Sequence, residues 1–85
     1  MKALGNCFSA HAAELDDGTS DAASVGAAVA PLCDQQLQEV AAAFTQGEHK
    51  RVTENVLATI RKSAPNWATG VVLAYRKAKA NLVAP

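Results

Sequence analysis

The sequence predicts an all-α protein, a small bundle of three to four helices whose N-terminal helical hairpin is clasped by one disulfide bond. Apolar residues recur at spacings of three and four along most of the 85 residues, which is the period of an amphipathic helix. Strict alternation of apolar and polar residues over the length of a strand occurs nowhere. The two cysteines stand on either side of one cluster of turn-forming residues, DDGTSD.

A chain of 85 residues is expected to form a single domain, residues 1–85, with a thin margin of stability. Aromatic residues make up only 5% of the sequence, so the core must depend on aliphatic side chains. The candidate core includes Leu15, Val29, Leu37, Val40, Leu57, Ile60 and Val71. Such a core suits a helical bundle and leaves no room for a large internal active site.

The first helix is predicted to end near Asp16, and its apolar face consists of Leu4, Phe8, His11 and Leu15. In the turn that follows, Gly18 can adopt the left-handed conformation that ends a helix. Thr19 or Ser20 can cap the next helix, with Asp21 in its first turn.

A second helical stripe consists of Val25, Val29, Leu32, Cys33, Leu37, Val40 and Phe44. Pro31 interrupts it, and a proline inside a helix predicts either a kink or a fresh start. Because the stripe keeps its phase across Pro31, a kink is favoured. Gly47 is expected to close this helix.

A third helix is predicted to begin at Glu48 and to end at the SAPN sequence of residues 63–66. A fourth stripe consists of Trp67, Val71, Tyr75, Ala78 and Leu82. The sequence therefore predicts three long helices or four shorter ones.

The cysteines are predicted to pair. Cys7 lies nine residues before Asp16, and Cys33 lies twelve residues after Asp21, which places the two thiols at nearly equal heights, about 14 and 18 Å from the turn. Facing cysteines at matched height can meet disulfide geometry. A Cys7–Cys33 disulfide would indicate an oxidising compartment.

Two other interpretations of the cysteines stay open. His11 lies one helical turn after Cys7, so Cys7, His11, Cys33 and His49 could together bind zinc, although only Cys7 and His11 have a ligand-pair spacing. A reactive thiol is the other interpretation, but the sequence has no C-x-x-C motif. The preferred prediction includes neither a metal site nor a cofactor.

Charges are segregated along the chain. Residues 1–45 contain six acidic residues and one basic residue, whereas residues 46–85 contain seven basic and two acidic residues. The two halves are expected to attract each other within a subunit or between subunits. Nucleic-acid binding by the basic half is an alternative, which the overall neutrality of the chain disfavours.

The segment from Cys7 to Cys33, with SDAASVGAAV at residues 20–29 between them, resembles a group of small exported helical proteins of proteobacteria, whose function is generally unassigned. The likeness covers about residues 4–45. Pro31 departs from the uninterrupted second helix that is usual in this group.

The sequences CDQQLQEVAAAF and VLATIRKSAP are also similar to those of helical immunity proteins that protect bacteria from their own secreted amidase effectors. The glycine-tyrosine motif typical of that family is absent, and no cysteine follows Pro65. An immunity or inhibitor role is therefore kept as an alternative.

No catalytic motif stands out: the five glycines are scattered, and no arrangement of Ser, His and Asp has a recognisable placement. We expect a non-enzymatic protein of the bacterial envelope or exterior, periplasmic or secreted, that binds a protein partner or a second copy of itself. Trp67 and Tyr75 are the candidate contact residues.

No apolar run is long enough to cross a membrane. Residues 2–15 are interpreted as part of the fold rather than as a signal peptide, so in an exported protein the signal would have been removed and Met1 would not be the native start.

Overall fold

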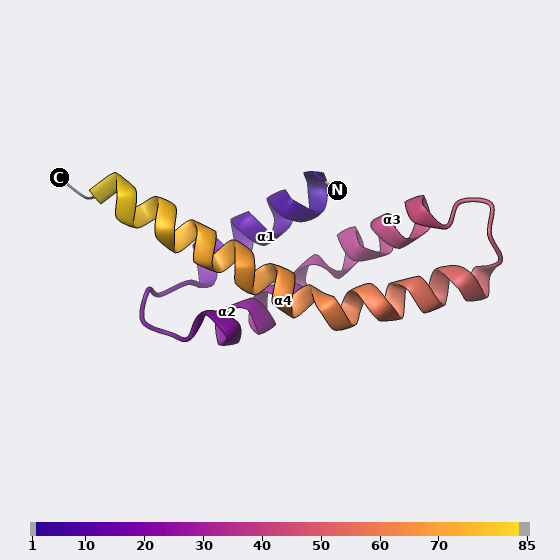
Figure 1. Ribbon diagram of the computed structural model, residues 1–85, viewed down its shortest axis with the longest axis horizontal. Helices are drawn as coiled ribbons and strands as arrows, with labels where there is room; N and C mark the ends of the chain where they lie inside the picture. Colours follow the sequence, from indigo (N-terminus) through magenta and orange to yellow (C-terminus); the bar gives the residue numbers. More distant parts are fainter. Residues whose placement is uncertain (1, 84–85) are drawn as a thin grey trace.

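Helices account for most of the chain in the computed structural model, which describes residues 2–83 (Figure 1). The elements are α1 (Lys2–Leu15), α2 (Ala22–Val29), a 3₁₀ turn η1 (Ala30–Cys33), α3 (Asp34–Phe44) and α4 (Lys50–Val83). These described residues contain no strand, so the prediction of an all-α fold is confirmed. None of these helices combines the length and the apolar character that a membrane span requires.

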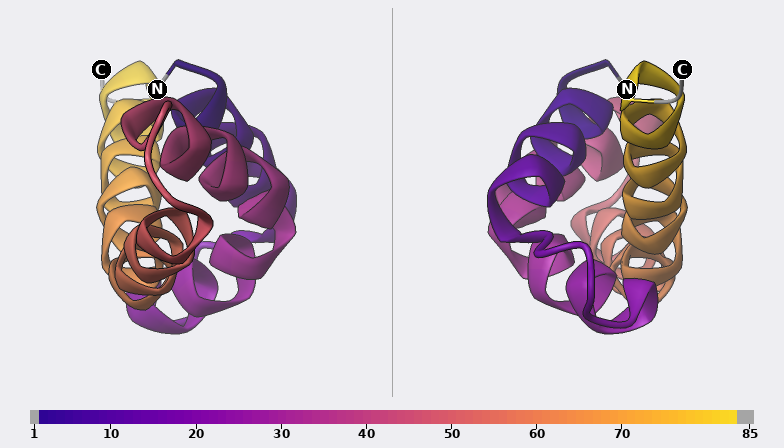
Figure 2. Two further views of the ribbon diagram at one scale, coloured as in Figure 1. Left: turned by 90° about the vertical axis from the view of Figure 1, so that its right-hand side faces the viewer. Right: turned by 90° about the vertical axis from the view of Figure 1, so that its left-hand side faces the viewer.

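The long helix α4 organises the molecule. It extends along the whole length of the protein, and α1, α2 and α3 all pack on it (Figures 1 and 2). The resulting shape is elongated, 54 × 21 × 15 Å. A single cluster of buried side chains draws on every element, and it comprises Leu4, Phe8, Ala12, Val25, Val29, Ala30, Cys33, Leu37, Val40, Ala64, Ala68 and Val72.

The turn between α1 and α2 is built from short-range hydrogen bonds. Gly18 has a φ of 78°, so the predicted left-handed conformation at this position is confirmed. Asp17 accepts hydrogen bonds from the backbone N–H groups of Thr19 (2.9 Å) and Ser20 (2.7 Å). These bonds to the charged form lower the pKa of Asp17. The cap of α2 is Asp21, which accepts from the Ser24 N–H, so the prediction of Thr19 or Ser20 as the cap was wrong.

Pro31 lies in the 3₁₀ turn that separates α2 from α3. The chain is thus divided here rather than merely kinked, contrary to the preferred prediction. The turn retains helical backbone angles up to Cys33, whose φ and ψ are −108° and 20°. Proline suits the start of such a turn because its missing N–H would have no partner there.

The predicted break at residues 63–66 was wrong. Pro65 lies inside α4, which is 34 residues long and changes direction near its middle (Figure 1). The proline removes one backbone hydrogen bond, but the buried stripe of Ala64, Ala68 and Val72 on both sides of it packs in the core. This packing supports a continuous helix where local propensity alone favours an end.

The third helix was predicted to begin at Glu48, and this boundary was also wrong, because the helix begins two residues later. Gly47, with a φ of 86°, follows α3, and α4 begins at Lys50. His49 precedes α4 and its Nδ1 accepts a hydrogen bond from the Arg51 N–H at 3.1 Å. An imidazole nitrogen therefore satisfies one of the free N–H groups of this helix end.

Candidate functional site

An apolar cleft lies between α1, α3 and α4. Its walls are formed by Leu4, Val40, Phe44, Ile60 and Trp67, and its volume is about 380 Å³. Every side chain in the wall is apolar or aromatic, as in sites that bind hydrophobic groups. The three helices contact one another in pairs, and each contributes side chains to the wall of the cleft.

Two aromatic side chains of the cleft are exposed to solvent. Phe44 is 70% exposed and Trp67 is 46% exposed. Residues of this size are usually covered in a monomeric protein, and an exposed group of them indicates a contact surface. Phe44 was predicted to continue the inward stripe of its helix, and this was wrong because Phe44 is the last residue of α3 and extends beyond the core.

Of the two predicted contact residues, Trp67 and Tyr75, only one lines the cleft. Trp67 lines the cleft, whereas Tyr75 is half-buried and is not part of the cleft wall. Sequence reasoning missed Phe44 as a surface residue. Its position immediately before TQG, at the end of a predicted helix, was the signal that could have found it. Leu15, a predicted core residue, is also 43% exposed because it is the last residue of α1.

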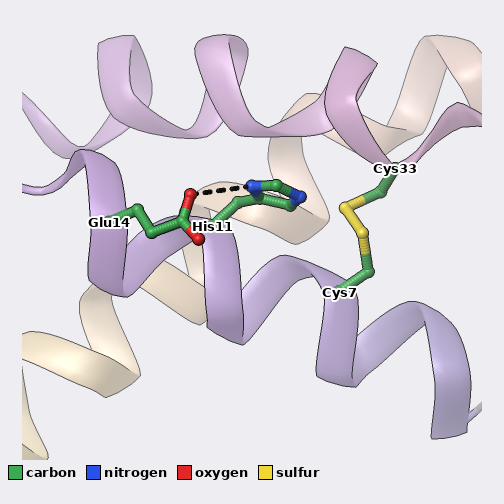
Figure 3. The surroundings of a disulfide bond; sticks show 4 residues. All are labelled: Cys7, His11, Glu14 and Cys33. Carbon is green, nitrogen blue, oxygen red and sulfur yellow. Dashed lines mark ion pairs between the residues drawn. A yellow bond between two sulfur atoms is a disulfide. The ribbon is translucent and has the colours of Figure 1, made fainter.

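A second group of residues lies at the junction of α1 and η1. The Sγ atoms of Cys7 and Cys33 are 2.11 Å apart, and the Cα atoms are 5.9 Å apart, so the two residues form a disulfide bond (Figure 3). Cys33 is fully buried and Cys7 is partly buried. The predicted Cys7–Cys33 pairing is therefore present across the helical hairpin.

His11 lies beside this disulfide. A ring nitrogen of His11 and the two sulfur atoms all lie within 4.8 Å of one another. His49 does not join this cluster, because it lies in the loop before α4 and bonds to Arg51 there. The structure thus brings together three of the four residues of the zinc interpretation.

Two ion pairs join the acidic half of the chain to the basic half, as the charge segregation predicts. Arg61 binds Asp34 with two hydrogen bonds, of 2.8 and 2.7 Å. Arg76 binds Asp16 at 2.6 Å and also donates to the Ser20 carbonyl. The Arg76 guanidinium lowers the pKa of Asp16, and that of Arg61 lowers the pKa of Asp34 to about 2.

No family model, curated protein or solved structure matches this chain.

Proposed function

We propose that this chain is a small, disulfide-clasped helical bundle of the bacterial envelope or exterior that acts without catalysis, by binding a second copy of itself through the apolar cleft. The observation that carries the proposal is the exposure of Phe44 and Trp67 beside a cleft with an apolar wall. Burying such aromatic surface is the main source of free energy in protein association.

A second copy is the preferred occupant because the surface offers both parts of a self-complementary contact. A two-fold interface uses the same patch on both subunits, so the patch must contain a protruding group and a recess. Phe44 is the protruding group, since 70% of its surface is exposed, and the recess lies directly beside it. Under a two-fold axis, Phe44 of each copy would enter the cleft of the other.

The disulfide supports the exported location. Disulfide bonds persist in oxidising compartments and are rare in the cytosol, and the Cys7–Cys33 bond joins α1 to η1 across the hairpin. A small domain with few large core side chains often depends on such a bond for its stability.

The ion pairs favour this proposal over nucleic-acid binding. Of the seven basic residues in the second half, Arg61 and Arg76 are each held by a carboxylate of the first half. Their charges are thereby compensated within the chain, which weakens any cationic surface for phosphates. An inhibitor role would use the same cleft with a different protein.

The test is the molar mass in solution as a function of concentration, by light scattering or sedimentation. The wild type is expected to show a monomer–dimer equilibrium, and Phe44→Glu is expected to be a monomer throughout. Leu73→Glu is the matched control, because Leu73 is 54% exposed and is not part of the cleft wall. Dimerisation should also shield Trp67 fluorescence from a soluble quencher.

A wild type that stays monomeric at every concentration, with Trp67 equally accessible to the quencher throughout, would overturn self-association. Equal weakening by Phe44→Glu and Leu73→Glu would show that the cleft is not the interface. Far-ultraviolet circular dichroism of each variant checks that the helices are intact.

A further inference from the structure

The group formed by Cys7, Cys33 and His11 contains the donor atoms of a metal site. Cys7 and His11 project from successive turns of α1, and Cys33 approaches them from η1 (Figure 3). One ring nitrogen and both sulfur atoms lie within 4.8 Å of one another. Two thiolates and one imidazole are ligands that Zn²⁺ prefers.

The orientation of His11 suits metal binding. Its Nδ1 faces Glu14 Oε2 at 3.4 Å, and its other ring nitrogen, Nε2, points toward the disulfide (Figure 3). Nδ1 is buried and has no hydrogen-bond partner among the described residues. A histidine that binds zinc through one nitrogen usually donates a hydrogen bond from the other nitrogen to a carboxylate, which fixes the ring. Glu14 stands at the position of that carboxylate.

We propose that reduction of the Cys7–Cys33 disulfide converts this cluster into a Zn²⁺ site, in which Cys7, Cys33 and His11 bind the ion and Glu14 orients the imidazole. The reductant is a dithiol. It supplies two electrons and two protons, the Cys7–Cys33 bond breaks to give two thiols, and the dithiol becomes a disulfide. Zn²⁺ then displaces both thiol protons, and water completes the four ligands.

The geometry requires only a short movement. Zinc–sulfur bonds of about 2.3 Å in a tetrahedral site place two sulfur atoms roughly 3.8 Å apart, a separation that fits within the 4.8 Å over which the three donor atoms already lie. A ring nitrogen of His11 already lies within 4.8 Å of both sulfur atoms. Because the Cα atoms of Cys7 and Cys33 are 5.9 Å apart, rotation of the two side chains after the bond breaks can bring the sulfur atoms to this separation.

Access to the bond is asymmetric. Cys33 is 0% exposed, whereas Cys7 is partly exposed. An incoming thiolate therefore attacks the Cys7 sulfur, and Cys33 leaves as the thiolate. The second thiol of the reductant then releases Cys7 from the mixed disulfide.

The test is a zinc titration of the reduced protein without oxygen, against a chromophoric chelator, with release of protons recorded in the same experiment. The reduced wild type is expected to bind one Zn²⁺ and to release two protons per ion, and the oxidised protein is expected to bind none. Co²⁺ used in place of Zn²⁺ should give thiolate-to-metal charge-transfer absorption.

Three variants assign the ligands. His11→Gln should weaken Zn²⁺ binding at least tenfold, and Glu14→Gln should weaken it about 10- to 100-fold. His49→Gln is the matched control and should bind as the wild type does, because His49 caps α4 instead.

Reduction can also loosen the fold, so helicity is followed in parallel. If the reduced chain loses helix without metal, Zn²⁺ is expected to restore it in the wild type and not in His11→Gln, since metal binding then drives folding. Absence of stoichiometric zinc binding by the reduced wild type would overturn the proposal. Equal affinity of His11→Gln and the wild type would overturn it too.

Discussion

Gly26 of α2 lies against Thr69 of α4 so closely that no side chain fits between them. A Cβ atom on Gly26 would lie 2.7 Å from the Thr69 backbone nitrogen and 2.8 Å from its Cα, distances that real Cβ atoms do not adopt. Gly26 is itself buried, and the Thr69 hydroxyl donates a hydrogen bond to the Pro65 carbonyl at 2.7 Å. The two helices meet backbone to backbone, and the obstacle cannot rotate away.

We predict that Gly26→Ala lowers the free energy of unfolding by about 1–3 kcal/mol, because the added methyl group forces α2 away from α4. Urea denaturation measures this change. The matched control is Gly70→Ala, where the new Cβ would meet no described atom within 4 Å outside its own turn of α4. That substitution is expected to raise stability by about 0.5–1 kcal/mol, since alanine favours a helix interior over glycine. Similar effects of the two substitutions would contradict the close approach.

The disulfide is expected to contribute much of the stability of this chain. It closes a loop between residues separated by 26 positions, and the chain-entropy relation gives roughly 3.5 kcal/mol for a loop of about this length. Reduction with a phosphine should lower the unfolding free energy by about this amount and raise the intact mass by two hydrogens. A Cys7→Ser/Cys33→Ser variant should melt like the reduced wild type and should not respond to reductant. A melting temperature unaffected by reductant would refute this prediction.

Much of the fold was predictable because local and tertiary signals agree. Positions such as Leu4, Phe8 and Val29 repeat at helical spacing and all lie in the core. The turn at residues 16–21 separates two such stripes and places Cys7 opposite Cys33. In this part of the chain, periodicity, turn chemistry and cysteine spacing all indicate the same hairpin.

The course of α4 could not be predicted from local signals. The sequence SAPN resembles a helix end, and only the burial of Ala64 and Ala68 on both sides of Pro65 explains why the helix continues. Whether these alanines are buried depends on where α2 lies. A stripe of small residues on one helix does not show which other helix will pack on it. Tertiary packing here outweighs propensity.

The cleft itself was not predicted, and only one of its residues was named as a contact residue, for a related reason. A helical stripe identifies which side chains are apolar, but it does not show whether another element covers them. Trp67 was named as a contact residue and lines the cleft, whereas Phe44 was assigned to the core and is 70% exposed. Exposure at a helix terminus depends on where the neighbouring helices end.

Arg76 is expected to be more important for stability than its surface position suggests. Its partner Asp16 has a side chain that is 2% exposed, and Arg76 also reaches the Ser20 carbonyl. Arg76→Gln would leave the Asp16 carboxylate without its cation in a poorly solvated place. We predict a lower melting temperature and faster hydrogen exchange in the turn at residues 16–21.

Lys77→Gln is the control for this substitution, because it makes the same change in charge at an exposed neighbouring residue. It should leave both the melting temperature and the exchange of the turn near wild-type values. If the two variants melt alike, net charge rather than the Asp16–Arg76 pair determines the effect.

The pair formed by Asp34 and Arg61 predicts a specific response to acid. The guanidinium of Arg61, and secondarily the amide of Gln38, lower the pKa of Asp34 from 3.8 to about 2. The unfolded chain therefore binds this proton at a higher pH than the folded chain does. The contribution of the Asp34–Arg61 pair to the free energy of unfolding is fully present above pH 3.8 and is lost as the pH falls through about 2. The loss is small at high salt, because both side chains are partly exposed, 33% for Asp34 and 48% for Arg61.

Carboxyl-carbon NMR titration measures the pKa of Asp34 directly. In Arg61→Gln the pKa is expected to rise from about 2 most of the way toward 3.8, because the first and largest cause of the shift is removed and only the Gln38 hydrogen bond remains. Arg51→Gln removes the same charge elsewhere on α4, where Arg51 is exposed, and should leave the titration of Asp34 unchanged. A wild-type Asp34 that titrates near 3.8 would show that the two hydrogen bonds from Arg61 do not persist in solution.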